Sequence, residues 1–110
     1  MSTGHSAFSL EHSAPDTLAV SGALDFDTAE AVLSQAGERL QDKRIRVLDL
    51  AGVNSADSAG LACVLALMAE SRDRDQQLEL SAVPKGLALL SRVSGTDALL
   101  GIAKPDPSDT

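Results

Sequence analysis

The chain has 110 residues, of which 44% are hydrophobic and 23% are charged, and its formal net charge is −7. This length is typical of one domain, and the hydrophobic content argues against global disorder. The excess of acidic residues argues against unassisted binding to nucleic acid or to anionic lipid, because both need a positively charged surface.

Phe8 and Phe26 are the only aromatic residues, so the sequence offers no Trp or Tyr as an anchor for a partner. The single cysteine, Cys63, lies in an apolar stretch and is expected to pack as a small hydrophobe. The N-terminus lacks the pattern of a signal peptide. The longest apolar stretch, 61–69, is too short to span a bilayer. We therefore expect a cytoplasmic protein without direct membrane insertion.

The ordered domain is expected over 7–103, between tails at 1–6 and 104–110. Alternating apolar residues predict strands over 8–12 and 17–21. Pro15 and Asp16 between these strands predict a turn, so the two form an antiparallel hairpin.

A helix is predicted to begin at Asp27, because Glu30 follows three residues later as in a capping box. Arg39 suits the end of this helix, where a cation complements the dipole, and the basic residues after it are interpreted as a solvated turn. The apolar run over 45–50 is typical of a central strand covered on both faces, with Asp49 at an edge or loop.

A second helix, 58–72, is apolar on most sides, which indicates either deep burial or a partner on a second face. A strand over 78–83 and a helix over 85–93, with Pro84 in its first turn, follow. A last edge strand is expected over 98–102. The order ββαβαβαβ predicts an α/β fold with a mixed sheet of four to five strands.

No motif in the sequence predicts catalysis. His5 and His12 have no partner at metal-ligand spacing. Asp25 and Asp27 form a carboxylate pair, but no base or nucleophile accompanies them, and Asp residues before a helix are typical of caps and turns. Phosphate-binding and dinucleotide-binding glycine patterns are absent. We expect no enzymatic activity, no metal and no cofactor, and a hydrolase that uses Asp25 or Asp27 is the weakest alternative.

The strand-to-helix junction at 54–61 is the most informative segment. Functional crevices in α/β sheets lie beyond the carboxyl ends of parallel strands, and a helix start exposes N–H groups. Ala59 and Gly60 are small, so another chain can approach closely. The structural alternative is an ordinary helix cap provided by Asp57 or Ser58.

This junction resembles the signature of STAS domains, modules named after sulfate transporters and anti-sigma factor antagonists. The resemblance rests on 48–50, on Val53 and on Asp-Ser-Ala-Gly-Leu at 57–61, and it extends over about 8–102. The segment 17–24 is similar to the family's second strand and the loop after it. The resemblance implies a STAS-like fold with helices mainly on one face of the sheet, and a role in binding another protein.

Two branches of the family remain open. Anti-sigma factor antagonists bind a kinase-type anti-sigma factor and are switched by phosphorylation of the Ser before the Gly, a position that holds Ala59 here. The MlaB-like STAS subunit of the Mla phospholipid-transport ABC complex has a Thr where this chain has Ser58, and a small residue follows it. We favour the second branch, since it accounts for Ala59.

The favoured branch implies docking on the cytoplasmic ATPase subunit of a transporter that maintains outer-membrane lipid asymmetry. The chain would then lie at the inner membrane through its partner. Ser58 is the leading candidate for a contact residue, as a cap for its helix and a polar contact to the partner. The remaining candidates frame the contact or form its rim: Asp57, Ala59, Gly60, Leu61, Asp25 and Asp27.

Overall fold

The computed structural model describes residues 8–95. The elements are, in chain order, β1 (Phe8–Ala14), β2 (Thr17–Leu24), α1 (Ala29–Arg39), β3 (Val47–Ala56), α2 (Ser58–Asp73), β4 (Glu79–Ser81) and α3 (Lys85–Ser94). The predicted order is confirmed over these residues. The expected tails and the strand over 98–102 lie outside the described residues, so the domain limits stay predictions.

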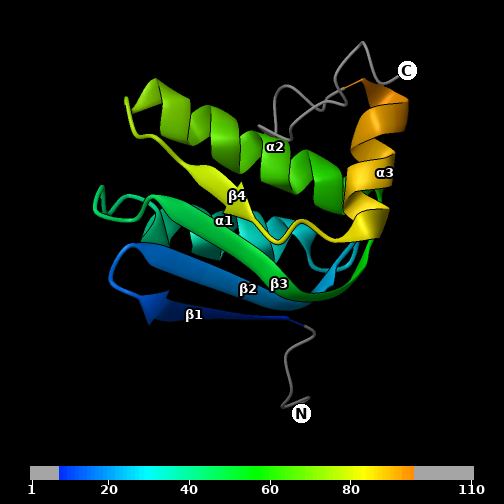
Figure 1. Ribbon diagram of the computed structural model, residues 1–110, viewed down its shortest axis with the longest axis horizontal. Helices are drawn as coiled ribbons and strands as arrows, with labels where there is room; N and C mark the ends of the chain where they lie inside the picture. Colours follow the sequence, from blue (N-terminus) through cyan, green and yellow to red (C-terminus); the bar gives the residue numbers. More distant parts are fainter. Residues whose placement is uncertain (1–7, 96–110) are drawn as a thin grey trace, which may run out of the picture.

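The four strands form one mixed sheet in the order β1-β2-β3-β4. β1 runs antiparallel to β2, whereas β2, β3 and β4 run parallel to one another. Helices α1 and α2 pack against each other on one side of the sheet, and α3 stands beside the N-terminal end of α2 (Figure 1). The predicted α/β fold with helices mainly on one face is therefore confirmed.

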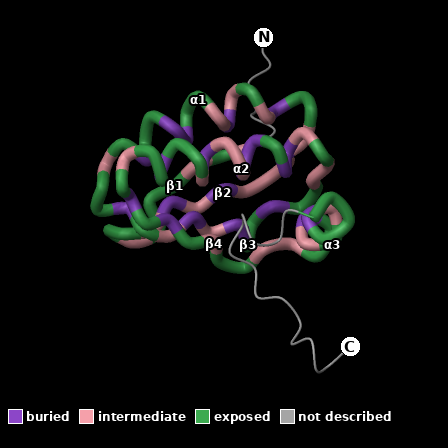
Figure 2. The backbone as a smooth tube through the Cα atoms, turned by 90° about the horizontal axis from the view of Figure 1, so that it is seen from above, coloured by how far each residue is buried: buried purple, intermediate pink, exposed green. Residues whose placement is uncertain are grey.

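The core lies between the helices and the two central strands. Figure 2 shows the buried stretches gathered in the interior, with exposed residues around them. Aliphatic side chains fill this layer, as the lack of aromatic residues requires: Leu18, Val20 and Leu24 from β2, Leu48, Leu50 and Val53 from β3, Val32 and Ala36 from α1, and Leu61, Val64 and Leu67 from α2. Cys63 is buried among them, as predicted, and burial raises the pKa of its thiol to about 11.

The central strand β3 differs from the prediction. It begins two residues later than expected and runs on to Ala56 instead of ending at Leu50. A β-bulge opposite β2 lets it pass through Gly52, where a Cβ would lie 2.5 Å from the Cβ of Ser21. Asp49 lies inside the sheet, and its Oδ1 accepts a hydrogen bond from the N–H of Ala51.

The coverage of β3 on both faces is also a wrong prediction. Leu48 and Leu50 are buried, but Val47 and Asp49, which alternate with them, are half-buried, and Ala51 is exposed. Helices therefore cover one face of the strand, and the other face is partly open to solvent. A run of apolar residues was not enough to distinguish these two cases.

The remaining strand limits follow from local backbone geometry. β2 continues past Gly22, which adopts a φ of 91°, because its ladder with β3 continues as far as Leu24. β4 is shorter than predicted, since Ala82 has a φ of 56° and leaves the extended conformation. Gly95, in the left-handed conformation, ends α3 as expected.

Helix α2 needs no undefined partner to explain its apolar composition. It packs on β2 and β3, with α1 on one flank and α3 on another. No helix in the described part of the chain is long and apolar enough to cross a membrane.

The amino ends of the parallel strands are held by one buried side chain. Gln76 is 6% exposed, and its Nε2 donates to the carbonyl oxygens of Asp42 at 3.2 Å and Ile45 at 3.0 Å. Its Oε1 accepts a hydrogen bond from Arg74, which also donates to the carbonyl oxygen of Leu40. These bonds join the loop before β3 to the loop before β4.

Candidate functional site

The candidate site lies at the carboxyl ends of β2 and β3, where α1 and α2 begin. The two strands are parallel and paired as far as Leu24 and Ala56, so the loops that follow them lie side by side. The structure therefore brings the loop at 25–28 next to the junction at 54–61, as the prediction required.

Asp57 holds the two segments together. Its Oδ1 accepts hydrogen bonds from the N–H groups of Ala59 at 2.9 Å and Gly60 at 3.1 Å, which caps α2. Its Oδ2 accepts a hydrogen bond from the N–H of Phe26 at 3.1 Å, and its own N–H donates to the carbonyl oxygen of Leu24. One carboxylate thus caps a helix and fixes the neighbouring loop.

The hydrogen bonds lower the pKa of the Asp57 carboxyl group, with the N–H of Gly60 as the largest cause and the N–H of Phe26 among the others. The stability that this group contributes is therefore fully present above the ordinary carboxyl pKa. It is lost as the pH falls through the lowered pKa of the folded state.

Gly60 sets how closely α2 approaches β2. A Cβ at this position would overlap the carbonyl carbon and oxygen of Leu24. Gly60 and Leu61 are buried, so both act through the packing of the junction and not through direct exposure. Ala59 is half-buried beside them.

Ser58 is exposed, and its hydroxyl makes no hydrogen bond to the described residues. The predicted role of Ser58 as a cap is wrong, because Asp57 precedes it in the extended conformation and takes the capping position. The physical reason is geometric: a capping side chain belongs to the residue just before the first helical turn and accepts the N–H groups two and three residues further along the chain. A polar contact between Ser58 and a partner stays a prediction.

Asp25 and Asp27 lie in the adjacent loop but differ in their surroundings. The Oδ1 of Asp25 accepts hydrogen bonds from the N–H groups of Asp27 at 3.0 Å and Thr28 at 3.2 Å, which makes Asp25 a turn former. Asp27 is exposed and does not cap α1, so that prediction is wrong. The helix begins later, after Thr28, because the turn around Asp25 occupies the residues between.

Phe26 is the residue at this site that sequence reasoning missed. Its side chain is 81% exposed and stands between Asp25 and Asp27 in the loop. The other phenylalanine, Phe8, packs against the core. One feature of the sequence could have predicted this exposure: Phe26 lies among acidic and turn-forming residues and does not belong to the periodic apolar pattern of a strand or helix.

The described residues offer neither a metal site nor a reactive cysteine. They contain no group of three or more His, Cys, Asp or Glu side chains that could hold a metal ion. His12 is exposed, whereas His5 lies outside the described residues. The high pKa of Cys63 keeps its thiol protonated at neutral pH, which does not suit a nucleophile.

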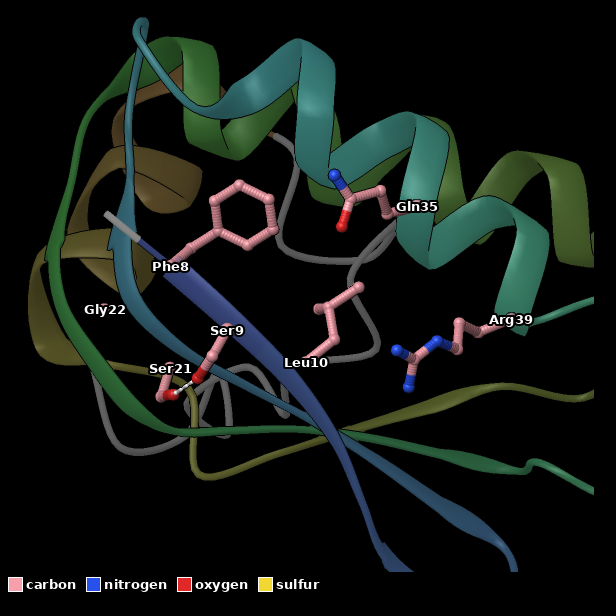
Figure 3. A pocket seen from close by; sticks show the side chains of 7 residues that line it. All are labelled: Phe8, Ser9, Leu10, Ser21, Gly22, Gln35 and Arg39. Atoms are coloured by element: carbon pink, nitrogen blue, oxygen red, sulfur yellow. Dashed lines mark hydrogen bonds between the residues drawn. The ribbon is translucent and has the colours of Figure 1, made fainter. Parts of the chain in front are cut away.

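The molecule also has an open hollow of about 490 Å³ away from the junction, between β1 and α1 (Figure 3). Phe8 and Leu10 point toward α1 in it, and Gln35 and Arg39 reach down from the helix. The hydroxyls of Ser9 and Ser21 bond to each other at its lower side. The hollow offers no paired acid and base, and none of the predicted site residues lines it.

Comparisons with known proteins agree with this architecture. The family model described as "Mlab, STAS domain" matches residues 9–101. No match was found among curated protein sequences. The solved structure of the anti-sigma factor antagonist SpoIIAA in its unphosphorylated form is 18% identical, with a TM-score of 0.65 over 94% of this chain and 91% of that one. The phosphorylated form of SpoIIAA, a Bacillus cell fate determinant, is 18% identical, with a TM-score of 0.63 over 94% of this chain and 95% of that one. At this identity the two structures show a shared fold.

Proposed function

We propose that this chain, which belongs to the MlaB-type STAS domain family, docks on the cytoplasmic ATPase subunit of a phospholipid-transport ABC complex. The docking surface is the junction at 54–61 together with the loop at 25–28. In this role the chain supports assembly and activity of the transporter and lies at the inner membrane through its partner. It performs no catalysis of its own.

Ala59 is the observation that carries this choice within the family. It stands directly before Gly60, whose position is fixed by contact with the Leu24 carbonyl group. In anti-sigma factor antagonists that resemble this chain, the residue before this Gly is the Ser that accepts the phosphoryl group. An alanine has no hydroxyl, which favours a partner interaction that does not depend on phosphorylation at this position.

The geometry of the helix start supports a protein partner more than a small anion. Asp57 already accepts hydrogen bonds from the N–H groups of Ala59 and Gly60, and its negative charge lies where an anion would otherwise bind. Ser58 and Asn54 are exposed around this carboxylate. The surface therefore offers polar and small side chains for packing against another protein.

Ser58→Arg tests the proposal. The variant should no longer co-purify with the ABC ATPase of the same organism, because the long charged side chain would project from the middle of the surface. Its melting temperature should stay at the wild-type value, since Asp57 and not Ser58 caps α2. Ser13→Arg is a matched control, because Ser13 is also exposed but lies near the β1–β2 turn at the other end of the sheet. Wild-type binding by Ser58→Arg would contradict the proposed surface.

The second candidate is an anti-sigma factor antagonist, and the exposed hydroxyl of Ser58 next to Ala59 favours it. In that case the anti-sigma factor kinase of the organism should phosphorylate Ser58 in the presence of ATP, which mass spectrometry of the peptide would detect. The Ser58→Ala variant should remain unmodified. The neighbouring genes offer a second distinction: an ATPase and a permease support transport, whereas a kinase-like anti-sigma factor and a phosphatase support the switch.

A further inference from the structure

We infer that Phe26 is the anchor of the docking surface, and that the partner receives its ring in an apolar pocket bordered by Arg or Lys side chains. This inference rests on the proposed function, because it describes the partner's side of the same surface. It adds one residue and one charge pattern that the family resemblance does not supply.

The exposure of Phe26 is the first reason. At 81%, it is the most exposed large hydrophobic side chain among the described residues. A phenyl ring in water is unfavourable, and burial against a partner recovers that free energy. Aromatic residues are enriched at the centres of protein interfaces, where a few side chains supply most of the affinity.

The second reason is that the backbone carrying the ring is fixed. The N–H of Phe26 donates to Asp57 Oδ2 at 3.1 Å. Thr28 is buried, and its hydroxyl donates to the carbonyl oxygen of Ala23 at 2.9 Å and accepts a hydrogen bond from the N–H of Asp25 at 3.0 Å. A loop held on both sides of the ring loses little conformational entropy on binding, so the contact contributes more to affinity.

The charge around the ring is the third reason, and it identifies the partner's chemistry. Segment 25–30 holds three carboxylates, Asp57 adds a fourth, and neither 25–30 nor 54–62 contains Lys or Arg. The one ion pair among the described residues lies elsewhere, between Asp42 and Arg44. Asp27 and Glu30 are exposed, so basic groups of a partner can reach them. Complementary charges of this kind raise the association rate and select the partner.

The same charges disfavour other occupants. A second copy of this chain placed ring to ring would bring acidic loops together, and like charges in an interface oppose association. Nucleic acid and anionic lipid are repelled for the same reason. The combination of an exposed ring with an acidic border therefore indicates a protein with a basic surface.

The experiment measures binding of the full chain to the purified ABC ATPase subunit from the same organism. Phe26→Ala should raise Kd about thirty-fold, the equivalent of a hot-spot residue of about 2 kcal/mol. Phe26→Leu should stay within about three-fold of wild type, because an apolar pocket accepts an aliphatic side chain of similar size. A Kd for Phe26→Ala within about two-fold of wild type would overturn the anchor.

Charge reversal tests the border of the pocket. Asp27→Lys should lower the association rate constant about ten-fold at low salt, and added salt should reduce the difference. Glu38→Lys is the matched control, since Glu38 is an exposed carboxylate near the far end of α1. Equal association rates for the two variants would overturn the inferred basic border.

The outcome with the wild-type chain separates this inference from the proposed function. If the wild-type chain binds the ATPase and Phe26→Ala binds equally well, the inference fails and the function stands. If the wild-type chain binds only the anti-sigma factor kinase of the organism, the transport function fails, and Phe26→Ala tests the anchor on that partner. Binding of the wild-type chain to neither protein would overturn both.

Discussion

Both ends of the parallel strands are held by one polar side chain that joins two loops, but the surfaces that result are different. At the amino end, Gln76 donates to two carbonyl groups, and the large apolar residues around it, Ile45 and Leu78, are buried. At the carboxyl end, Asp57 accepts three N–H groups, and Phe26, which it fixes, is left exposed.

The charges differ in the same way. The amino end carries both signs, and there Asp42 pairs with Arg44 at 2.9 Å, so that the hydrogen bond from the guanidinium lowers the pKa of Asp42 to about 2. The carboxyl end carries carboxylates only, from Asp25 to Glu30 and at Asp57. The amino end therefore pairs a carboxylate with a cation and buries its apolar side chains, whereas at the carboxyl end the ring is exposed and the carboxylates have no ion-pair partner within the described residues.

Gly60→Ala, at the carboxyl end of the strands, should cause the largest loss of stability. The new Cβ would overlap the carbonyl group of Leu24, so α2 must move away from β2, and we expect a loss of about 3 kcal/mol in the free energy of unfolding. Gly86→Ala is the matched control, because no atom lies within 4 Å of its Cβ position in α3. That change should be neutral or stabilise the protein by up to about 1 kcal/mol, since alanine favours a helix. Urea unfolding of both variants measures the difference, and equal stabilities would contradict the close contact.

Gln76→Ala, at the amino end of the strands, should cause a smaller loss of stability. The change removes the donor to the buried carbonyl group of Ile45 and the acceptor of Arg74, which should cost about 2 kcal/mol of stability. The carbonyl group of Asp42 keeps its hydrogen bond from the N–H of Ile45. Gln77→Ala, at the exposed neighbouring position, should change stability by less than about 0.5 kcal/mol. Neither variant should alter affinity for the ATPase once folded. A binding defect in folded Gln76→Ala would show that the amino end also takes part in docking.

The sequence predicted the order of the elements, because hydrophobic period and turn residues are local signals. The start of α2 beside Asp57 and the turn-forming role of Asp25 followed from the same kind of signal. The length of β3 was not predictable, since its passage through Gly52 depends on how Ser21 of β2 lies against it.

The two most informative side chains were missed for the same reason. Gln76 stands in a polar segment of the sequence, yet the loop before β3 folds over it and buries its amide. Phe26 is one of only two aromatic residues in the sequence, yet Asp57 holds its backbone at the surface. In both cases a contact about thirty residues away along the chain decides burial, and no local pattern records such a contact.

Hydrogen–deuterium exchange of the wild-type chain, free and bound to the ABC ATPase, tests the central claim most directly. The account predicts that binding slows exchange at the carboxyl end, over 25–30 and 54–62, and leaves the loops at 40–46 and 74–78 unchanged. Slower exchange at 40–46 and 74–78, with no change over 25–30 and 54–62, would contradict it.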